Sequence, residues 1–409
     1  MSSLRIEHQC PQCGAPAELE ETDRLFACPF CRVRSVLVTR DYHRYVLPAR
    51  DPKARELAYL PYWRFKGVLL TLRPAGNDFK FVDVSQLAVD APGVPHSLGL
   101  RSQAMKLKFA VSEMPGRFIA PARPAADALA ALSGRFSRHL PPSVMWWTLL
   151  GESMGVLFAP FYAKDRLYDA VLDRPVGGAA AGVLDAGFKD ARPDCRVTFV
   201  AAMCPSCGWD LEGARDALAL VCRNCASTWG AAGERLERVD CFRGAESGEP
   251  TARWFPFWLI GGEVSGVDLG TYADLVRIAN LPKVVRGPTA DIPFRFWVPA
   301  FKLRAEAFLR LAELVTVNQP QDRLTPSPPP APHQPVNFPV QEAGELLKAV
   351  LAGFFKPRHR LPEFLPGLSI RTTSFSLAYL PFVEDPHDFI EPQTRLAINK
   401  NQLRLSNNL

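Results

Sequence analysis

Several signatures of catalysis are missing from this sequence of 409 residues. It contains only seven histidines, and none of them lies in an HExxH pattern or a similar cluster. It has no GxxxxGKS/T phosphate-binding loop and no GxGxxG motif after a strand, because the glycines of residues 261–266 are more typical of a turn or bulge. These absences exclude the commonest metalloprotease and nucleotide-dependent chemistries, and we predict that the chain is not an enzyme.

One pattern typical of hydrolases does occur. Residues 151–155, Gly-Glu-Ser-Met-Gly, match the GxSxG sequence of a nucleophile elbow. That motif requires a helix directly after the serine, whereas residues 156–161 have the composition of a strand and include Pro160. We therefore expect a hairpin turn at these glycines rather than an esterase site.

Long apolar segments are also lacking. Residues 1–8 contain no apolar stretch of a signal peptide, so we predict a cytoplasmic protein. The most hydrophobic stretch, residues 144–163, carries Glu152 near its middle, and a carboxylate at the centre of a membrane helix costs about 2.5 to 3.5 kcal/mol. We expect buried strands in this stretch and no membrane span.

The composition that remains is that of a packed protein. Hydrophobic residues make up 47% of the chain and charged residues only 22%, values typical of a globular rather than a disordered sequence. At a prior of about 150 residues per domain, this length predicts two to four domains.

Eight of the ten cysteines form two sets of four with the same spacing. In each set a CPxCG motif is followed, after fourteen intervening residues, by a second CxxC pair, and the sets are offset by 194 residues. The first set is Cys10, Cys13, Cys28 and Cys31, and the second is Cys204, Cys207, Cys222 and Cys225. Two CxxC knuckles can direct four thiolates at one ion, at about 2.3 Å for zinc. We predict two zinc ions per chain, with iron in a rubredoxin-like site as the main alternative.

Four thiolates would complete the coordination of each ion and leave no position for water or substrate, so we expect structural rather than catalytic sites. Gly14 and Gly208 follow the first CxxC pair of each set and predict a turn with positive φ. Disulfides are the competing interpretation, but intracellular thiols stay reduced. Cys195 and Cys241 lie outside both sets and are expected to be ordinary buried or half-buried thiols.

The repetition extends beyond the cysteines. Three aromatic segments of the first half recur in the same order in the second half: 59–67 as 254–262, 118–122 as 296–300, and 158–162 as 379–383. Matches in one order with drifting offsets are typical of a tandem duplication with loop insertions.

These aromatic segments predict buried strands, and the prolines inside them should lie at an edge, a bulge or a strand start. A base-stacking or peptide groove is the alternative, favoured slightly in the first copy by Arg64 and Lys66. Residues 125–132 and 341–351 have helical patterns. We predict an α+β fold of two tandem pseudo-repeats, each a rubredoxin-like zinc ribbon followed by a mostly antiparallel sheet domain with a few helices.

The expected boundaries follow from the cysteines and the repeats. We predict zinc ribbon 1 at residues 1–40, α+β domain 1 at 41–195, zinc ribbon 2 at 196–235 and α+β domain 2 at 236–409. Residues 318–339 hold eight prolines, and we expect an exposed loop there.

The CPxCG ribbon together with Leu60-Pro61-Tyr62-Trp63 resembles a loosely defined group of uncharacterised bacterial zinc-ribbon proteins. In that group, such a ribbon precedes an aromatic PYW or PFW strand, and the resemblance covers these two features of each half. Some members are labelled as relatives of the primosomal helicase. This chain lacks helicase phosphate-binding motifs, so the resemblance implies a bacterial zinc protein without that activity.

We therefore expect a non-catalytic zinc-binding adaptor or scaffold that mediates protein-protein interaction in a bacterial complex. The alternative is a nucleic-acid-binding protein that uses ribbon 1 and the basic segment 32–55. Its cations are Arg32, Arg34, Arg40, Arg44, Arg50, Lys53 and Arg55, against only two carboxylates. The net charge of +6 neither demands nor excludes a polyanionic partner. An enzyme with a site between the halves would need convergent titratable groups.

Overall fold

The computed structural model describes residues 5–39, 42–52, 56–99, 106–177, 181–185, 187–192, 197–233, 235–246, 248–249, 251–285, 287, 290–320, 324–355 and 358–406. The chain forms two compact units. Unit 1 comprises Met1–Val68, Phe81–Pro141 and Gly151–Ala201, and unit 2 comprises Leu69–Lys80, Pro142–Leu150 and Ala202–Leu409. Unit 2 therefore includes two segments from the first half of the chain, which differs from the linear boundaries that the sequence suggests.

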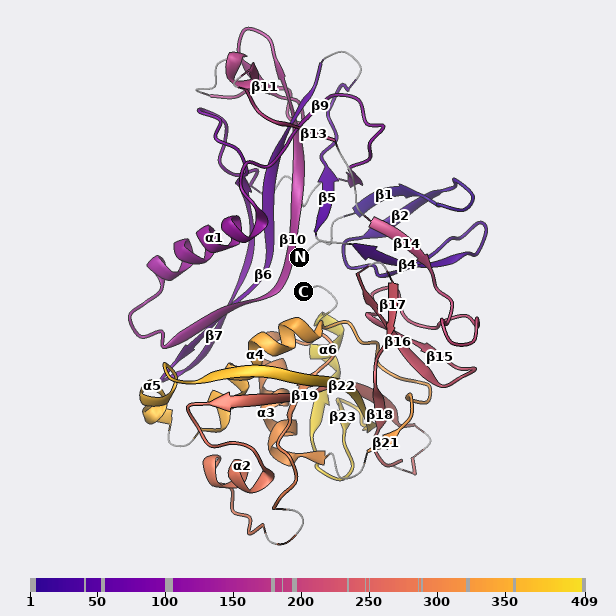
Figure 1. The fold of residues 1–409 in the computed structure, drawn as a ribbon, viewed down its shortest axis with the longest axis vertical. Helices are drawn as coiled ribbons and strands as arrows, with labels where there is room; N and C mark the ends of the chain where they lie inside the picture. Colours follow the sequence, from indigo (N-terminus) through magenta and orange to yellow (C-terminus); the bar gives the residue numbers. More distant parts are fainter. Residues whose placement is uncertain are drawn as a thin grey trace. The chain divides into compact units, whose positions relative to one another are not determined.

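The largest sheet has eleven strands in the order β13-β9-β6-β10-β5-β8-β1-β2, with β7 beside β6 and with β11 and β12 continuing from β10. Its long strands β6 and β10 run side by side (Figure 1). The strands are β1 (Arg5–Gln9), β2 (Pro16–Glu20), β5 (His43–Val46), β6 (Ala58–Arg73), β7 (Gly76–Leu87), β8 (Lys106–Phe109), β9 (Arg117–Ile119), β10 (Trp146–Ala163), β11 (Leu167–Asp169), β12 (Arg174–Pro175) and β13 (Asp190–Ala191). Leu60, Tyr62 and Trp63 of β6 are buried, because removing their apolar surface from water is favourable.

A seven-stranded sheet lies in unit 2, with the order β20-β19-β22-β18-β21 and with β23 and β24 continuing from β22. Its strands are β18 (Cys241–Arg243), β19 (Arg253–Ser265), β20 (Phe296–Pro299), β21 (Thr325–Pro326), β22 (Ser369–Glu384), β23 (Asp388–Ile390) and β24 (Ala397–Asn399). β19 and β22 pair antiparallel along their length, and the register shifts between Gly261 and Gly262. This shift confirms the bulge expected at these glycines.

Two three-stranded sheets flank the cysteine clusters. The first has the order β14-β4-β3 and the second the order β15-β16-β17. Their strands are β3 (Leu25–Ala27), β4 (Arg34–Thr39), β14 (Val197–Ala201), β15 (Ala219–Cys222), β16 (Ser227–Ala232) and β17 (Arg235–Arg238). β14 was expected to begin ribbon 2, but it pairs antiparallel with β4 of ribbon 1.

The helices are few. They are α1 (Ala125–His139), α2 (Tyr272–Ile278), α3 (Ala305–Asn318), α4 (Val340–Phe354), α5 (Leu361–Phe364) and α6 (Lys400–Ser406), with 3-10 turns at η2 (Ala181–Asp185) and η5 (Arg358–Arg360). α3 packs against β20 and α4, and α4 packs against β22. α4 buries Leu346, Leu347 and Val350, which share one face at helical spacing. In the part of the chain that the structure describes, no helix is long and apolar enough to cross a membrane.

The architecture is α+β and mainly strand, as predicted. α1 and α4 occupy the two predicted helical segments, whereas α2 and α3 were not predicted. The larger sheets are mixed, because β1 with β8, β5 with β10, β6 with β9, and β18 with β22 pair in parallel. The GxSxG residues lie inside β10, which continues as a strand to Ala163, so no nucleophile elbow forms and the expected hairpin turn is wrong.

Pro256 lies within β19 rather than at a sheet edge or strand start. The pairing of β19 with β20 ends at Phe257 opposite Pro299, and the Pro256 carbonyl accepts the N–H of Ala300 at 3.0 Å beyond that end. A backbone N–H at Pro256 would face the Ala300 carbonyl, which instead accepts the N–H groups of Asn337 and Phe338, so the proline leaves no acceptor unpaired.

The proline-rich stretch also differs from the exposed loop that its composition predicts. Among its described residues, Gln334, Val336 and Asn337 are buried. Their backbone groups are bonded to the core of unit 2, since Gln334 N–H donates to the Trp254 carbonyl at 2.7 Å and Asn337 N–H donates to that of Ala300 at 3.0 Å. Trp254 N–H in turn donates to the Pro332 carbonyl. The prolines form a packed strap along β19.

Candidate metal centres

Each cysteine pair lies in a tight backbone turn. In ribbon 1, the N–H of Cys10 donates to the Ala15 carbonyl at 2.8 Å and the N–H of Gly14 donates back to the Cys10 carbonyl at 2.9 Å. The second pair repeats this pattern, with Cys28 bonded to Val33 and Arg32 bonded to Cys28. β1 and β2 flank the first turn, and β3 and β4 flank the second. Two short hairpins thus present their cysteines to each other.

A left-handed residue follows the second cysteine of every pair. Gly14 has φ of +71° and Gly208 has φ of +74°, as predicted from the glycines. Arg32 and Ala226 occupy the corresponding place in the second turns with φ of +61° and +51°. The left-handed region is unfavourable for these two residues, so the turn geometry is imposed by the fold.

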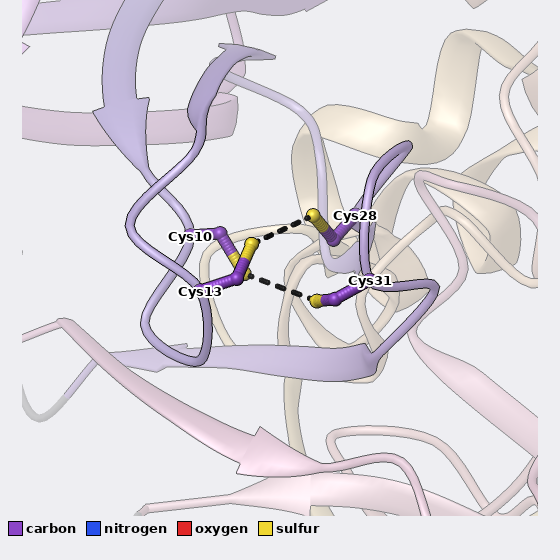
Figure 2. Close-up of side chains that lie close together, drawn as sticks. All are labelled: Cys10, Cys13, Cys28 and Cys31. Atoms are coloured by element: carbon purple, nitrogen blue, oxygen red, sulfur yellow. Dashed lines mark hydrogen bonds between the residues drawn. The ribbon is translucent and has the colours of Figure 1, made fainter.

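The four sulfurs of each set converge. In both clusters the ligand atoms all lie within 4.8 Å of one another, and Figure 2 shows the four side chains of ribbon 1 pointing toward a common centre. The Sγ atoms of Cys10 and Cys31 are 3.7 Å apart, as are those of Cys13 and Cys28. In ribbon 2 the corresponding distances are 3.5 Å.

These distances fit a tetrahedral metal ion. Four sulfurs at about 2.3 Å from a central zinc ion would be about 3.8 Å apart, whereas a disulfide joins its sulfurs at about 2.05 Å. All eight cysteines are free thiols in the structure. Each cluster can therefore hold one thiophilic ion, and the first cysteine of each pair is buried while the second is more exposed.

The thiols also carry opposed proton affinities. The N–H groups of Cys31 and Phe30 hydrogen-bond to Cys28 and lower its pKa to about 6. Although the N–H of Val33 lowers the pKa of Cys31, burial and its crowded neighbouring sulfurs raise that pKa to about 12. Four adjacent sulfurs cannot all be anionic without a cation among them. A metal ion that takes deprotonated thiols supplies that cation.

Ribbon 2 has the same opposition. Burial raises the pKa of Cys204, but the Ser227 hydroxyl and the N–H groups of Ser206 and Cys207 bring it down to about 6. Burial raises the pKa of Cys222 to about 11. Ribbon 2 thus also brings together four sulfurs that could hold one metal ion.

A buried ionic cluster fastens ribbon 1 to its unit. The Arg64 guanidinium, only 2% exposed, donates two hydrogen bonds of 3.0 Å to the Asp83 carboxylate and one of 2.6 Å to Glu21, which lies between β2 and β3. Lys66 Nζ is 3.6 Å from the Glu21 carboxylate. Burial lowers the pKa of Arg64, but Glu21 and Asp83 raise it above its usual value. Arg64 and Lys66 thus face carboxylates inside the protein rather than a groove.

The proline-rich strap fastens ribbon 2. Leu218 N–H donates to the Val336 carbonyl at 2.7 Å, and the Asn337 carboxamide donates to the Asp216 carboxylate at 2.6 Å. Arg223, in the second cysteine turn, donates to the Pro329 carbonyl at 2.6 Å. The sequence did not reveal these partners, because they are separated by more than a hundred residues.

His8 and Cys241, which the sequence also singled out, do not belong to either cysteine cluster. His8 stacks on Phe199 at a ring distance of 4.7 Å and is not part of the cysteine cluster, and burial lowers its pKa. Cys241 is half-buried, and burial raises the pKa of its thiol to about 12. Cys195 lies outside the described residues.

The basic segment is only partly described. Arg40, Lys53 and Arg55 lie outside the described residues. Arg44 stacks over the Tyr42 ring at 4.2 Å, and Arg32 is exposed on its turn. Among the described cations of this segment, Arg44 therefore lies against an aromatic ring, whereas Arg32 is exposed to solvent.

Comparison with known proteins returned no match: no protein-family model, no curated protein and no solved structure matches the chain. The functional assignment accordingly depends on the two clusters of four cysteines, each of which can hold a metal ion.

Proposed function

We propose that this chain is a non-catalytic adaptor in which two structural zinc ions fold two ribbons that bind a protein partner. The observation that carries the proposal is the pair of closed four-sulfur clusters, with sulfurs 3.5 to 3.7 Å apart. Zinc ribbons of this size cannot bury a core of their own, so the metal supplies their folding free energy. Such an ion has no open position for catalysis.

We further propose that the chain is a tandem duplication. This is supported by the strand orders, because β9-β6-β10-β5 in one sheet parallels β20-β19-β22-β18 in the other. Trp63 and Trp258 occupy matching places, and each indole donates to a distant backbone carbonyl, of Arg123 and Phe338 respectively. The halves have diverged, since β9 is parallel to β6 whereas β20 is antiparallel to β19.

The partner-binding role is supported by apolar side chains beside the cysteines. Phe30 is 65% exposed in ribbon 1, and Trp209 and Met203 are 60% and 50% exposed in ribbon 2. Trp, Phe and Met are enriched in protein interfaces, and an exposed Trp loses little entropy on binding. We assign these residues to the recognition surfaces of the ribbons.

A second candidate function is supported at ribbon 1 alone. Phe30 and Arg32 are both exposed in the same cysteine turn. An exposed aromatic ring next to a cation is the composition of a platform on which a single-stranded base stacks. Binding of single-stranded DNA or RNA that weakens steeply with salt, and that is lost in Phe30→Ala, would favour this function over the adaptor.

The adaptor role is tested by installing a photo-crosslinking amino acid at position 209 or, as a matched control, at Asp210 in the same turn. Both variants are expressed in the native host, checked for two bound metals, and irradiated. We expect specific protein adducts from position 209 that Met203→Ser reduces. Identical adducts from both positions, or none from either, would contradict a recognition surface at Trp209.

A further inference from the structure

The two cysteine clusters differ in the side chains that surround their sulfurs. In ribbon 2 the Ser227 hydroxyl oxygen lies 3.0 Å from Cys225 Sγ and 3.6 Å from Cys204 Sγ. Trp229 Nε1 lies 2.8 Å from the same oxygen, and both Ser227 and Trp229 are buried. The side chain of Asn224 hydrogen-bonds to Cys207.

The direction of these bonds follows from the donors. An indole N–H can only donate, so Trp229 occupies an acceptor position of the Ser227 hydroxyl. The single hydroxyl proton then remains for a sulfur, and a metal-bound thiolate can only accept it. Ser227 therefore donates its proton to a thiolate of ribbon 2, the nearer being Cys225 Sγ at 3.0 Å, and Trp229 fixes the orientation of that hydroxyl.

Ribbon 1 has different residues at these places. At the offset of 194, Val33 corresponds to Ser227, Ser35 to Trp229 and Phe30 to Asn224. The side chain of Val33 has no hydrogen-bond donor, and Phe30 is turned outward with 65% of its surface exposed. Within the described part of ribbon 1, the donors to cysteine sulfur from outside the cluster are backbone N–H groups, such as those of Phe30 and Val33.

We propose that Ser227, Trp229 and Asn224 are positioning residues that make ribbon 2 the inert metal site and leave ribbon 1 as the exchangeable one. Hydrogen bonds to a metal-bound thiolate disperse its charge, hold it in place and reduce its nucleophilicity, and losing such an outer partner typically costs about 10- to 100-fold in metal affinity. The inference rests on the proposed function, because it requires an ion in both clusters.

The test uses the full-length protein loaded with two zinc ions, as counted by native mass spectrometry. It is exposed to excess EDTA together with N-ethylmaleimide. A freed thiolate adds its sulfur to the maleimide double bond, and the adjacent carbon takes a proton from water. Mass spectrometry of the digested peptides then gives a separate rate for each cysteine set. We expect the cysteines of ribbon 1 to be labelled at least about 10-fold faster than those of ribbon 2.

Variants assign the difference to the proposed residues. Ser227→Ala should accelerate labelling of ribbon 2 at least about 10-fold and leave ribbon 1 unchanged. Ser206→Ala is the matched control and should change neither rate. Ser206 is an exposed serine of the same ribbon, and its backbone N–H hydrogen-bonds to Cys204. Trp229→Phe keeps a ring in the core but removes the N–H, so it should accelerate ribbon 2 even if Ser227→Ala fails to fold.

The possible failures are distinguishable. Fewer than two ions before the challenge would contradict the proposed function itself. Two ions, followed by labelling of both ribbons at one rate or of ribbon 2 first, would overturn the inference and leave the proposed function intact. Unchanged rates in both Ser227→Ala and Trp229→Phe would overturn it as well.

Discussion

Gly14 and Gly208 stand at positive φ, and a Cβ added at either would meet nothing within 4 Å. Substitution by alanine therefore introduces backbone strain without a steric clash. We expect Gly14→Ala and Gly208→Ala each to destabilise their ribbon by about 1 to 2 kcal/mol. The free energy of local opening, measured by hydrogen exchange of the ribbon amides, checks this value.

Gly134 provides the matched control for these variants. It lies within α1, has open space around its Cβ position and has no positive φ. Gly134→Ala should stabilise α1 by up to about 1 kcal/mol, because alanine is the better helix former. A loss of stability of the same size in all three variants would contradict the conformational explanation.

A single cysteine change should remove one ion only. Cys204 is buried in ribbon 2, and replacing its sulfur by the Ser hydroxyl leaves three thiolates for that ion. We expect Cys204→Ser to lose the metal of ribbon 2 and to retain that of ribbon 1, which native mass spectrometry would register as one ion instead of two. Cys241→Ser should retain both ions, and loss of metal in that variant would contradict the assigned clusters.

At the scale of residues, the sequence predicts the cysteine clusters well because CxxC spacing is a local property of the chain. It predicts Gly14 and Gly208 for the same reason. Arg32 and Ala226 were missed because neither residue type favours a left-handed conformation. Ser227 was missed because a serine two residues after a cysteine has no partner until the fold brings Trp229 and the sulfurs to it.

At the scale of elements, the ion cluster around Arg64 makes ribbon 1 dependent on β6 and β7. Arg64→Met would leave Glu21 and Asp83 buried without their guanidinium, and breaking a buried pair in this way costs about 3 to 5 kcal/mol. We expect a correspondingly lower thermal stability of unit 1 in calorimetry.

Lys106 is the control for Arg64. Its pair with Glu18 is half-exposed and screened by solvent, so Lys106→Met should cost much less stability than Arg64→Met. Equal effects of the two variants would show that burial does not set the contribution of these charges.

The strands and the helices α1 and α4 could be predicted because each carries its own pattern of apolar side chains. Strand pairing could not, since it depends on contacts between distant segments. The parallel pairs β5–β10 and β18–β22 and the placement of β14 beside β4 belong to this class. The proline-rich strap was mistaken for an exposed loop because its anchors are backbone bonds to Trp254 and Ala300, which composition does not report.

At the scale of the whole molecule, two clusters of equal spacing occur in two halves with similar strand orders. We propose that one ancestral arrangement, a metal-fastened ribbon followed by a sheet, was duplicated and then diverged. Ribbon 1 is held by charges around Arg64, and ribbon 2 by the strap from Pro329 to Asn337. The two cysteine clusters thus have similar geometry but different attachments to the surrounding protein.

The central claim is that eight sulfurs hold two zinc ions. Native mass spectrometry of the full-length chain, purified without chelators or added metal and combined with elemental analysis, tests it most directly. We predict a mass increase that corresponds to two zinc ions per chain, less the protons that each ion displaces from its thiols. A chain that folds and carries no metal, or that carries iron in both clusters, would contradict the claim.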